Sequence, residues 1–539
     1  MKKNFQKNWR ELIILALVVA LAIFLRFYKI SELHFFTYDQ SRDALYIKRM
    51  IVEHKWRLLG TQTSYPGVYC PPFYYYSAMP FLWLFGLNPV GLDVYTAFFG
   101  VLTVVLIWYV ADKFFGKPAG ILIAPIYATM PLIVELSRRA WNLNTLPFFA
   151  LLTIYFLWRV WQSWQFKDLV IASALFGYTI SLHMGAPVVV PVLLVSWLRY
   201  WQKTKKAKPV IFAFLVFFFF LSPVVIFDFR HQHLLTKDFI RFFFYEKRVG
   251  VSKESFLGPV FTSFFTIFSV LFSGNFSKMT GGPLDFSGKI GNLKDFFTKP
   301  MPISVVAHKP LSFEYQWWGP VLMILTSVVS IFWWKKNRET KKSLKPNISL
   351  GLIWSWILIG VFLSRFYQGK FYFFYYTFLF PMPFLLLSLT LRHGWTKRFL
   401  RPLIATAAVL IVGYNLSRIK TFETPQRTIK DLVLVAQTIS QDNPPDLDFN
   451  LATNQVDPDR WDHNAVDYRY FVEAYFGQKP LDWLPEDYQK AQVLYLIDED
   501  SIENPIKSPI MEIATFGPKS VSQEWKLVNG VTIYRLEKQ

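Results

Sequence analysis

The chain is 539 residues long, and 53% of these residues are hydrophobic and 19% aromatic, with 55 Phe. A water-soluble protein of this length could not readily bury so much apolar surface, so the composition excludes an ordinary soluble enzyme. The net charge is +21, but the basic residues stand in short clusters between apolar runs, which argues against nucleic acid as a partner. The single cysteine, Cys70, excludes an intrachain disulfide and a metal site built from several cysteines.

Apolar runs recur along the chain as far as residue 416, for example at residues 12–24, 210–227 and 350–363. With its flanks, each run approaches the roughly 20 apolar residues that cross a bilayer. One run alone would also fit a signal peptide, but the recurrence indicates a polytopic α-helical membrane protein. We expect about eleven transmembrane helices. They are centred near residues 12–30, 90–110, 119–136, 145–161, 168–183, 186–200, 209–227, 317–334, 348–365, 371–391 and 402–417.

The clusters of Lys and Arg predict how these helices are oriented. The clusters that share one side of the predicted membrane lie at residues 2–10, 113–117, 159–167, 203–208, 335–345 and 392–401. The positive-inside rule makes that side cytoplasmic. We therefore predict a multi-pass protein of the cell (plasma) membrane with a cytoplasmic N-terminus and two long external loops, at about residues 31–89 and 228–316. Within the second loop, residues 255–272 favour a helix that lies on the membrane surface.

The composition changes after the last apolar run. From residue 421 onward the chain carries 11 Lys and Arg against 20 Asp and Glu, a balance of −9, whereas the preceding part carries +30. Residues 429–439 have helical spacing, and residues 448–453, 493–497 and 525–536 each predict a strand. The sequence thus predicts a membrane domain at residues 1–420 and a small extracytoplasmic α/β domain at residues 421–539.

The first external loop opens with an acidic motif at residues 36–44. If this stretch is helical, Asp39, Arg42 and Asp43 share one face through their three- and four-residue spacing. A carboxylate at the edge of the hydrocarbon can act as a general base on an acceptor hydroxyl or amine. A solvated helix start with a local ion pair explains the same residues without any chemistry.

Further along this loop, Cys70 is followed by two prolines and then by Phe73 and Tyr74 in an aromatic run. The prolines favour an extended approach, and tyrosines suit the membrane interface. An aromatic belt is the simpler interpretation of this stretch, and a substrate contact through Tyr74 is the alternative.

Several cations and polar residues lie on the predicted outer side. Arg138 and Arg139 close the third predicted span, and Arg365 and Lys370 lie between the ninth and tenth. Together they could form a phosphate-binding patch at headgroup depth, and snorkelling to lipid headgroups is the alternative.

The histidines are weaker candidates. His183 stands at a tight turn, where a structural role is common, and His231 and His233 make a pair without further ligands, which is a weak metal signal.

The order of these motifs resembles that of the GT-C glycosyltransferases. An acidic motif follows the first helix, a Pro-Pro-aromatic-Tyr-Tyr stretch comes next, and a Ser-Arg-x-Ala stretch at residues 137–140 closes the third span. The likeness is to the protein O-mannosyltransferase and aminoarabinose-transferase branch. It covers residues 10–200 well and the later spans by their layout, including the aromatic residues 371–380, whereas the C-terminal domain matches only as an extracytoplasmic appendage.

This resemblance implies a GT-C-like fold and the transfer of a hexose or pentose from a polyprenyl-phosphate carrier, on the external face, to a lipid, glycan or protein acceptor. Asp39 corresponds to the family's loop carboxylate, which is a general base or an acceptor-positioning group, and Arg138 to the Arg of the Ser-Arg-x-Ala stretch. Such chemistry otherwise needs donors that stabilise the departing phosphate. The sequence has no Gly-rich phosphate loop, which fits a lipid-linked donor.

The sequence departs from the family at three places. Gln40 stands where many relatives have Glu, so Asp43 must supply any second carboxylate. Cys70 replaces a Lys or His before the two prolines, and Leu143 stands where the Ser-Arg stretch usually reaches an Asp. These departures make a carboxylate metal site less well supported, although a divalent metal stays possible.

We therefore take Asp39 and Asp43 as the catalytic candidates. The substrate-binding candidates are Arg42, Tyr74, Arg138, Arg139, Asn142, His183, Arg365 and Lys370. Two alternatives stay open. One is a polymerase or ligase that transfers a whole lipid-linked oligosaccharide, in which Arg230, His231 and His233 would gain importance. The other is a transporter or flippase without chemistry.

Overall fold

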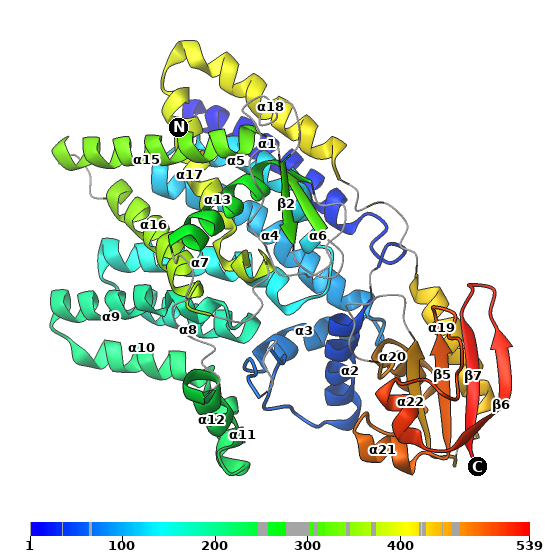
Figure 1. Cartoon of the computed structure of the whole chain (residues 1–539). Helices are drawn as coiled ribbons and strands as arrows, with labels where there is room; N and C mark the ends of the chain where they lie inside the picture. The colour runs from blue at the N-terminus through cyan, green and yellow to red at the C-terminus, as the bar shows by residue number, and fades with distance from the viewer. Residues whose placement is uncertain are drawn as a thin grey trace. The chain divides into compact units, whose positions relative to one another are not determined.

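A computed structural model shows that the chain is mostly helical, with a small sheet in its C-terminal part (Figure 1). The structure describes residues 2–34, 36–63, 67–245, 257–275, 301–305, 311–315, 317–340, 345–367, 373–419, 422, 427–444, 446–454 and 463–539.

The chain forms two compact units. The first, the helical unit, comprises Met1–Tyr28, Arg57–Ser77 and Asp93–Phe422. The second, the sheet unit, comprises Lys29–Trp56, Ala78–Leu92 and Glu423–Gln539. Two segments of the first 92 residues thus form one compact unit with the C-terminal part of the chain. The domain boundary that we place at residues 420 and 421 stays a prediction.

Apolar helices make up most of the helical unit. Helices that belong to it wholly or in part are α1 (Lys2–Phe27), α3 (Phe73–Leu84), α4 (Val90–Phe115), α5 (Ala119–Thr129), α6 (Pro131–Leu136), α7 (Leu146–Ser163), α8 (Phe166–Leu182), α9 (Val190–Thr204), α10 (Ala207–Phe219), α11 (Ser222–Arg230), α12 (Leu234–Ile240), α13 (Leu257–Ser273), α15 (Trp318–Thr340), α16 (Lys345–Ser364), α17 (Pro381–Trp395) and α18 (Arg401–Ser417). Short 3-10 helices are η1 (Asn142–Thr145), η2 (Ala186–Val189), η4 (Phe373–Leu379) and η5 (Arg398–Leu400), and η3 (Arg241–Tyr245) is a short π-helix. Three antiparallel strands are added in the order β1 (Gly274–Asn275), β3 (Leu311–Tyr315) and β2 (Met301–Val305).

Five helices are long and apolar enough to cross a membrane. They are Val90–Phe115, Asn142–Ser163, Trp318–Asn337, Asn347–Ser364 and Arg398–Ser417. Two bent pairs raise the number to as many as seven among the described residues, with bends of 60° between α10 and α11 and 52° between η4 and α17. Pro223 and Pro381 lie at the start of the second member of each pair, where a missing N–H interrupts the helical hydrogen bonds. The chain is therefore a multi-pass membrane protein, and the predicted number of about eleven spans stays unconfirmed.

Helix α13 covers most of the segment that we expected on the membrane surface. Its residues 266–273 are all buried. Ser269 and Ser273 lie so close to Gly319 of α15 that an added Cβ there would meet the Ser273 hydroxyl at 2.3 Å. Small residues allow helices to approach in this way. The C-terminal half of α13 is therefore enclosed by protein, unlike a helix that lies on a membrane with one face free.

The sheet unit has a four-stranded sheet in the order β4-β5-β7-β6. Its elements are α2 (Tyr38–Glu53), α19 (Ile429–Asp442), β4 (Phe449–Asn454), α20 (Val466–Phe476), α21 (Pro485–Lys490), β5 (Val493–Asp498), α22 (Met511–Phe516), β6 (Lys519–Lys526) and β7 (Thr532–Lys538). Strands β4 and β5 are parallel, and the other pairs are antiparallel. The predicted strand at residues 525–536 is in fact the end of β6, a turn and β7. Asn529 and Gly530 make this turn, and Gly530 has a φ of +83°.

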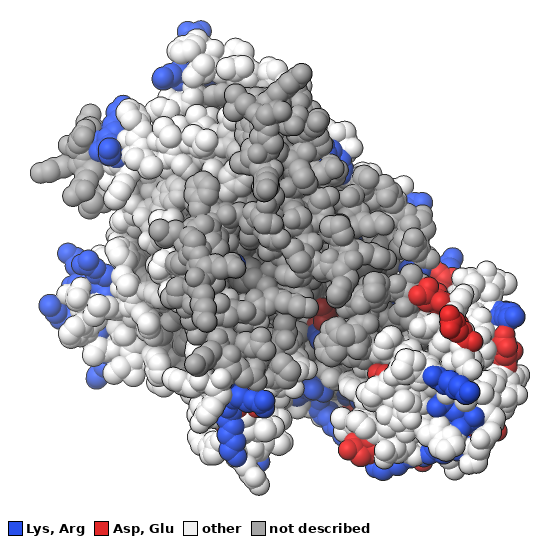
Figure 2. Space-filling view, viewed as in Figure 1, with Lys and Arg blue, Asp and Glu red and all other residues white. Residues whose placement is uncertain are grey.

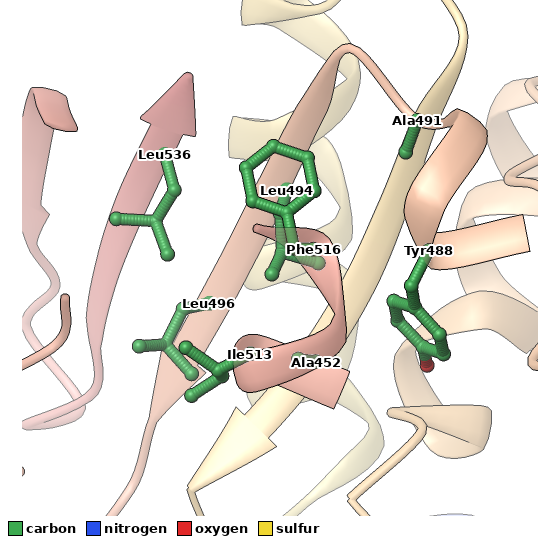
Figure 3. Close-up of a cluster of buried hydrophobic side chains, with 8 residues drawn as sticks. All are labelled: Ala452, Tyr488, Ala491, Leu494, Leu496, Ile513, Phe516 and Leu536. Carbon is green, nitrogen blue, oxygen red and sulfur yellow. The ribbon is translucent and has the colours of Figure 1, made fainter. Parts of the chain in front are cut away.

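The sheet buries apolar side chains on both faces. On one face, Leu494 and Leu496 of β5 pack against Ile513 and Phe516 of α22 in a cluster of buried hydrophobic side chains (Figure 3). Tyr495, which alternates with them along β5, points the other way and donates a hydrogen bond to Asp442 of α19 at 2.7 Å. The unit is therefore a small α/β layer structure with its own core.

Surface charge differs between the units. In Figure 2 Lys and Arg of the helical unit occur in small groups with white residues beside them, and most Asp and Glu in view lie on the sheet unit. Helices α10 and α18 expose large apolar side chains such as Phe219, Val409 and Leu410. Such surface suits lipid and not water.

Candidate active site

The acidic motif lies on the first turn of α2 in the sheet unit. Gln40 caps this helix, because its Oε1 accepts hydrogen bonds from the Thr37 backbone N–H at 3.3 Å and the Thr37 hydroxyl at 2.5 Å. The Gln40 side chain is buried. The residue that stands in place of the expected Glu therefore has a structural role at the start of α2.

Asp39, Arg42 and Asp43 come together on one face of α2. Arg42 Nη1 lies 3.0 Å from Asp39 Oδ1, and Arg42 Nη2 lies 3.0 Å from Asp43 Oδ1. The Asp39 side chain is 39% exposed, whereas those of Arg42 and Asp43 are 10% and 2% exposed. A buried arginine thus joins two carboxylates, of which Asp39 is the accessible one.

Tyr74 lies inside the helical unit. Pro71 and Pro72 precede the first turn of α3, where proline is compatible with a helix start. The Tyr74 ring is buried, with its centre 5.7 Å from that of Tyr75 and 6.1 Å from that of Tyr95. Tyr74 is therefore enclosed by aromatic side chains and is not part of an exposed aromatic belt.

Three hydroxyl groups meet near this tyrosine cluster. Ser77 Oγ lies 2.8 Å from the Tyr95 hydroxyl and 2.6 Å from that of Tyr178, and the two tyrosine hydroxyls are 3.0 Å apart. They come from α3, α4 and α8. Sequence spacing did not predict this cluster, because its members are far apart in the chain.

Arg138 binds the end of the first helix. The third predicted span is broken between α5 and α6, and Arg138 follows α6. Arg138 Nη1 donates to Leu25 O at 3.0 Å and Nη2 to Tyr28 O at 2.9 Å. The last carbonyls of a helix have no partner within it. The Arg138 guanidinium, which also lies over the Phe422 ring, therefore supplies partners to the carboxyl end of α1.

Arg26 connects α1 to the end of α5. This arginine of α1 is fully buried, and its Nη1 donates to Ala128 O near the end of α5 at 3.1 Å. Gly100 of α4 leaves the space for it, since an added Cβ there would lie 3.0 Å from Arg26 Nε and 2.5 Å from Ser137 Cβ. The two arginines thus tie α1 to the broken span.

Arg139 is more accessible than Arg138. Its Nη2 lies 2.5 Å from Glu135 Oε1, one helical turn earlier, and the two side chains are 24% and 14% exposed. The guanidinium therefore has both a carboxylate partner and a solvent-accessible part.

Asn142 and His183 lie near each other in the helical unit. Asn142 Nδ2 donates to Leu182 O at 2.5 Å, directly before His183. Asn142 Oδ1 is buried without a hydrogen-bond partner among the residues that the structure describes. His183 Nδ1 accepts from Gly185 N at 2.9 Å, so a neutral imidazole carries its proton on Nε2.

Aromatic rings line the same region. The Trp141 ring lies 4.7 Å from that of Phe374, and the His183 ring lies 4.9 Å from that of Tyr375. Both partners belong to η4. The region thus combines an amide, an imidazole and aromatic faces.

Arg365 follows the last turn of α16. Tyr376 of η4 has Arg365 and Ser364 as hydrogen-bond partners, the latter at 3.0 Å. Lys370 lies outside the described residues, so the predicted joining of these two cations stays a prediction.

His231 and His233 lie at the end of α11. His231 Nδ1 lies 2.8 Å from Phe227 O, and His233 Nδ1 lies 3.5 Å from Asp228 Oδ2. Among the described residues, no group of three or more His, Cys, Asp or Glu side chains could hold a metal ion.

The predicted residues thus form separate groups. Asp39, Arg42 and Asp43 make a charged cluster in the sheet unit, and Asn142 and His183 share a polar and aromatic region in the helical unit. Tyr74, Arg138, Arg139 and Arg365 belong to the helical unit too, each with the partners given above.

Comparison with known proteins gives matches in sequence and in structure. The profile of the dolichyl-phosphate-mannose-protein mannosyltransferase family matches residues 70–227. No curated protein matches the chain. The structure of ArnT from Cupriavidus metallidurans bound to undecaprenyl phosphate is similar over 96% of this chain and 97% of its own, at 12% identity and a TM-score of 0.56. The archaeal oligosaccharyltransferase AglB from Archaeoglobus fulgidus, in complex with an inhibitory peptide and a dolichol-phosphate, is similar over 98% of this chain and 74% of its own, at 12% identity and a TM-score of 0.53.

These matches confirm the resemblance that the sequence predicts. The chain has the fold of the GT-C glycosyltransferases and resembles their mannosyltransferase and ArnT branch. The structural similarity covers nearly the whole chain, including the C-terminal part for which the sequence motifs offered little.

Proposed function

We propose that this chain is a membrane glycosyltransferase that transfers a hexose or pentose from a polyprenyl-phosphate-linked donor to an acceptor on the extracytoplasmic face, with Asp39 as general base. The observation that carries the proposal is the geometry of α2, which holds one accessible carboxylate in an ion pair with a buried arginine. The fold shared with ArnT, whose structure holds undecaprenyl phosphate, supports the class of donor.

Asp39 would act on the acceptor. Arg42 binds Oδ1 of Asp39, so Oδ2 can accept the proton that an acceptor hydroxyl or amine loses as it attacks the anomeric carbon of the sugar. The bond between that carbon and the phosphate oxygen breaks, and its electron pair leaves with the polyprenyl phosphate. Asp43, which is buried against the same arginine, would fix the direction of the Arg42 side chain.

The helical unit would bind the donor. Asn142 offers a buried acceptor oxygen without a described partner, and His183 and its aromatic neighbours offer a ring surface, a combination that suits a sugar. Arg139, Arg365 and Lys370 would supply positive charge for the phosphate. Both terminal nitrogens of Arg138 donate hydrogen bonds to carbonyls at the end of α1, so we propose that Arg138 acts by holding α1 in place.

The test uses membranes from cells that produce the full chain, supplied with undecaprenyl-phosphate-[14C]mannose as the probe. Transfer is the radiolabel that leaves the undecaprenyl-phosphate carrier, measured by chromatography that separates the donor from any labelled lipid, glycan or protein product. Asp39→Asn should lower transfer at least about 100-fold, the loss expected when a general base is removed. Binding of undecaprenyl phosphate should be unchanged.

The matched control is Glu32→Gln, because Glu32 lies in the same loop and also forms an ion pair, with Lys29 at 3.3 Å. This control should transfer normally. Full transfer by Asp39→Asn would refute the role of Asp39. Movement of the intact donor across vesicles, without transfer by the unaltered chain, would favour a flippase.

Transfer of a whole lipid-linked oligosaccharide is the second candidate, because the fold also matches an oligosaccharyltransferase. The two functions differ in the size of donor that reacts. A chain that transfers an oligosaccharide and leaves undecaprenyl-phosphate mannose untouched would favour this candidate. In that case His231→Ala and His233→Ala should lower transfer as well.

A further inference from the structure

Helix α2, which carries Asp39, lies beside α20 of the same sheet unit (Figure 1). The two helices are more than 400 positions apart in the chain. Both ends of α2 have polar contacts with α20 or with residues next to it. These contacts bear on how Asp39 is held in place.

The chain just before α2 is bound by Arg427 and α20. Arg427 Nη2 donates to Phe36 O at 3.2 Å and to Asp467 Oδ2 at 2.6 Å, while its Nη1 donates to Glu499 at 2.6 Å. The Phe36 ring packs edge-on against Tyr470 and Phe471 of α20, with ring centres 5.4 Å apart in each case. The Asp467 side chain is 1% exposed. A buried ion pair therefore fixes the backbone three residues before Asp39.

The first turn of α2 also contacts Asp467. Ser41 Oγ donates to Thr37 O, in the N-cap of α2, at 2.8 Å and lies 3.3 Å from Asp467 Oδ1. Asp467 thus lies next to Ser41 on one side of Asp39 and is joined by Arg427 to Phe36 on the other.

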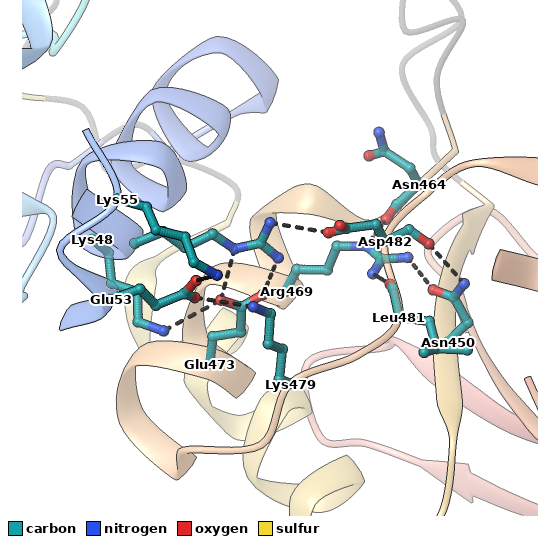
Figure 4. Close-up of polar contacts among 11 residues, drawn as sticks. Lys48, Glu53, Lys55, Asn450, Asn464, Arg469, Glu473, Lys479, Leu481 and Asp482 are labelled. Carbon is teal, nitrogen blue, oxygen red and sulfur yellow. Dashed lines mark hydrogen bonds and ion pairs between the residues drawn. The ribbon is translucent and has the colours of Figure 1, made fainter. Parts of the chain in front are cut away.

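The last turns of α2 are held by Glu473 (Figure 4). Its carboxylate lies 3.3 Å from Lys48 Nζ and 2.6 Å from Arg49 Nη2, and Arg49 Nη1 reaches Asp482 at 3.0 Å. The Glu473 side chain is 1% exposed. Burial alone would lower the pKa of Arg49, but the hydrogen bonds and charges of Glu473 and Asp482 outweigh it and raise that pKa. Arg49 therefore stays charged and bound.

Helix α20 is itself fixed to the sheet. Arg469, between Asp467 and Glu473, is fully buried and donates to Asn464 O at 2.5 Å and Leu481 O at 2.5 Å (Figure 4). It also donates to the Asn450 side chain and, at 3.2 Å, to Leu451 O of β4. Helix α20, which contacts α2, is therefore itself bound to β4 in the core of the sheet unit.

We propose that Asp467 and Glu473 are positioning residues for the transfer reaction: α20 holds α2 at both ends and so sets the location and rotation of Asp39. This inference rests on the proposed role of Asp39. A shift of about 1 Å in a reacting group can cost about 100-fold in rate without changing how the substrate binds. The sheet unit would then act on catalysis through α2.

The experiment compares full-length variants in the transfer assay with undecaprenyl-phosphate-[14C]mannose. Asp467→Asn keeps the shape of the side chain and removes its charge. It should lower kcat about 10- to 100-fold while the KM for the donor stays within about twofold. Glu473→Gln, which loosens the other end of α2, should lower kcat in the same sense and serves as the second variant if Asp467→Asn does not fold.

The matched control is Asp442→Asn. Asp442 belongs to the same unit and lies on α19, where its partners are Arg535, at 3.1 Å, and the hydroxyl of Tyr495, both on the sheet. Its loss should lower the unfolding temperature and leave kcat within about twofold. Hydrogen exchange adds a second readout: amides of α2 should exchange faster in Asp467→Asn and unchanged in Asp442→Asn.

Three outcomes would overturn the inference. The first is normal kcat in both Asp467→Asn and Glu473→Gln. The second is an equal loss of kcat in Asp442→Asn, which would show only general destabilisation. The third is full transfer by Asp39→Asn, in which case the proposed function fails and the inference fails with it. The first two leave the loss in Asp39→Asn intact, so the two failures are distinguishable.

Discussion

Replacement of Arg138 by lysine tests whether this residue holds α1 or binds phosphate. Arg138 donates two hydrogen bonds, to Leu25 O and Tyr28 O, from two different nitrogens. Lysine keeps the positive charge, but its single ammonium on a shorter stem can remake one of these bonds. One buried carbonyl is then left without a partner.

The magnitude follows from what is lost. An unsatisfied buried carbonyl costs about 1–3 kcal/mol. The contact of the guanidinium with the Phe422 ring, at 5.5 Å, contributes about 0.5–1 kcal/mol more. We therefore expect Arg138→Lys to destabilise the chain by about 1.5–4 kcal/mol.

Thermal unfolding of the full chain in one detergent, followed by tryptophan fluorescence, measures this effect. Arg139→Lys is the control, since Arg139 is partly exposed and its pair with Glu135 is worth at most about 1 kcal/mol. Arg138→Lys should unfold at a clearly lower temperature than Arg139→Lys. An unchanged unfolding temperature together with weaker binding of undecaprenyl phosphate would refute the structural role and assign Arg138 to the phosphate.

Two further predictions concern packing and pH. Gly100→Ala should destabilise the chain by about 1–3 kcal/mol, because the new Cβ would lie 2.5 Å from Ser137 Cβ. Gly351→Ala is its control, with nothing within 4 Å of the new Cβ, and equal unfolding temperatures in the two variants would contradict the argument. Burial disfavours the charged form of Glu53, but hydrogen bonds from Lys479 and Lys55 outweigh it and lower its pKa from 4.5. A carboxyl group whose pKa is lowered by folding stabilises the folded state at a pH above its pKa in the unfolded chain. This stability is lost as the pH falls through its pKa in the folded chain. Glu53→Gln should therefore be less stable than the unaltered chain at pH 7. The difference should disappear as the pH falls below about 4.5, and a difference that does not change with pH would count against it.

The sequence predicted those parts of the fold that depend on local patterns. Apolar runs identified a multi-pass membrane protein, and the motif order identified the GT-C resemblance. Strands β4 and β5 lie where buried apolar runs predicted them. Residues 525–536 were wrongly assigned to one strand, because the Asn529-Gly530 turn sits between two runs of similar composition.

Part of the site was predictable for the same reason. Asp39, Arg42 and Asp43 meet through helical spacing, which is a local property. The contact between Arg49 and Glu473 joins residues 424 positions apart, and spacing carries no information about such a pair. Thr37 and Gln40 have the spacing of a capping box, so the role of Gln40 could have been predicted from the sequence. The role of Arg138 could not, since its partners are backbone carbonyls, which every sequence provides.

The kind of contact between α2 and α20 bears on what the sheet unit does. Ion pairs buried as deeply as that of Glu473 stabilise a fold little more than apolar residues of the same size would, because removing the charges from water costs nearly what their attraction returns. Apolar side chains could therefore hold α2 about as firmly, but they tolerate rotation and sliding. Hydrogen bonds to charged groups fix direction as well as distance. In the proposed mechanism α2 presents the Asp39 carboxylate to a reacting atom, and that role would need such a directional restraint. We therefore assign the polar contacts of Asp467 and Glu473 to the placement of Asp39 and not to stability alone.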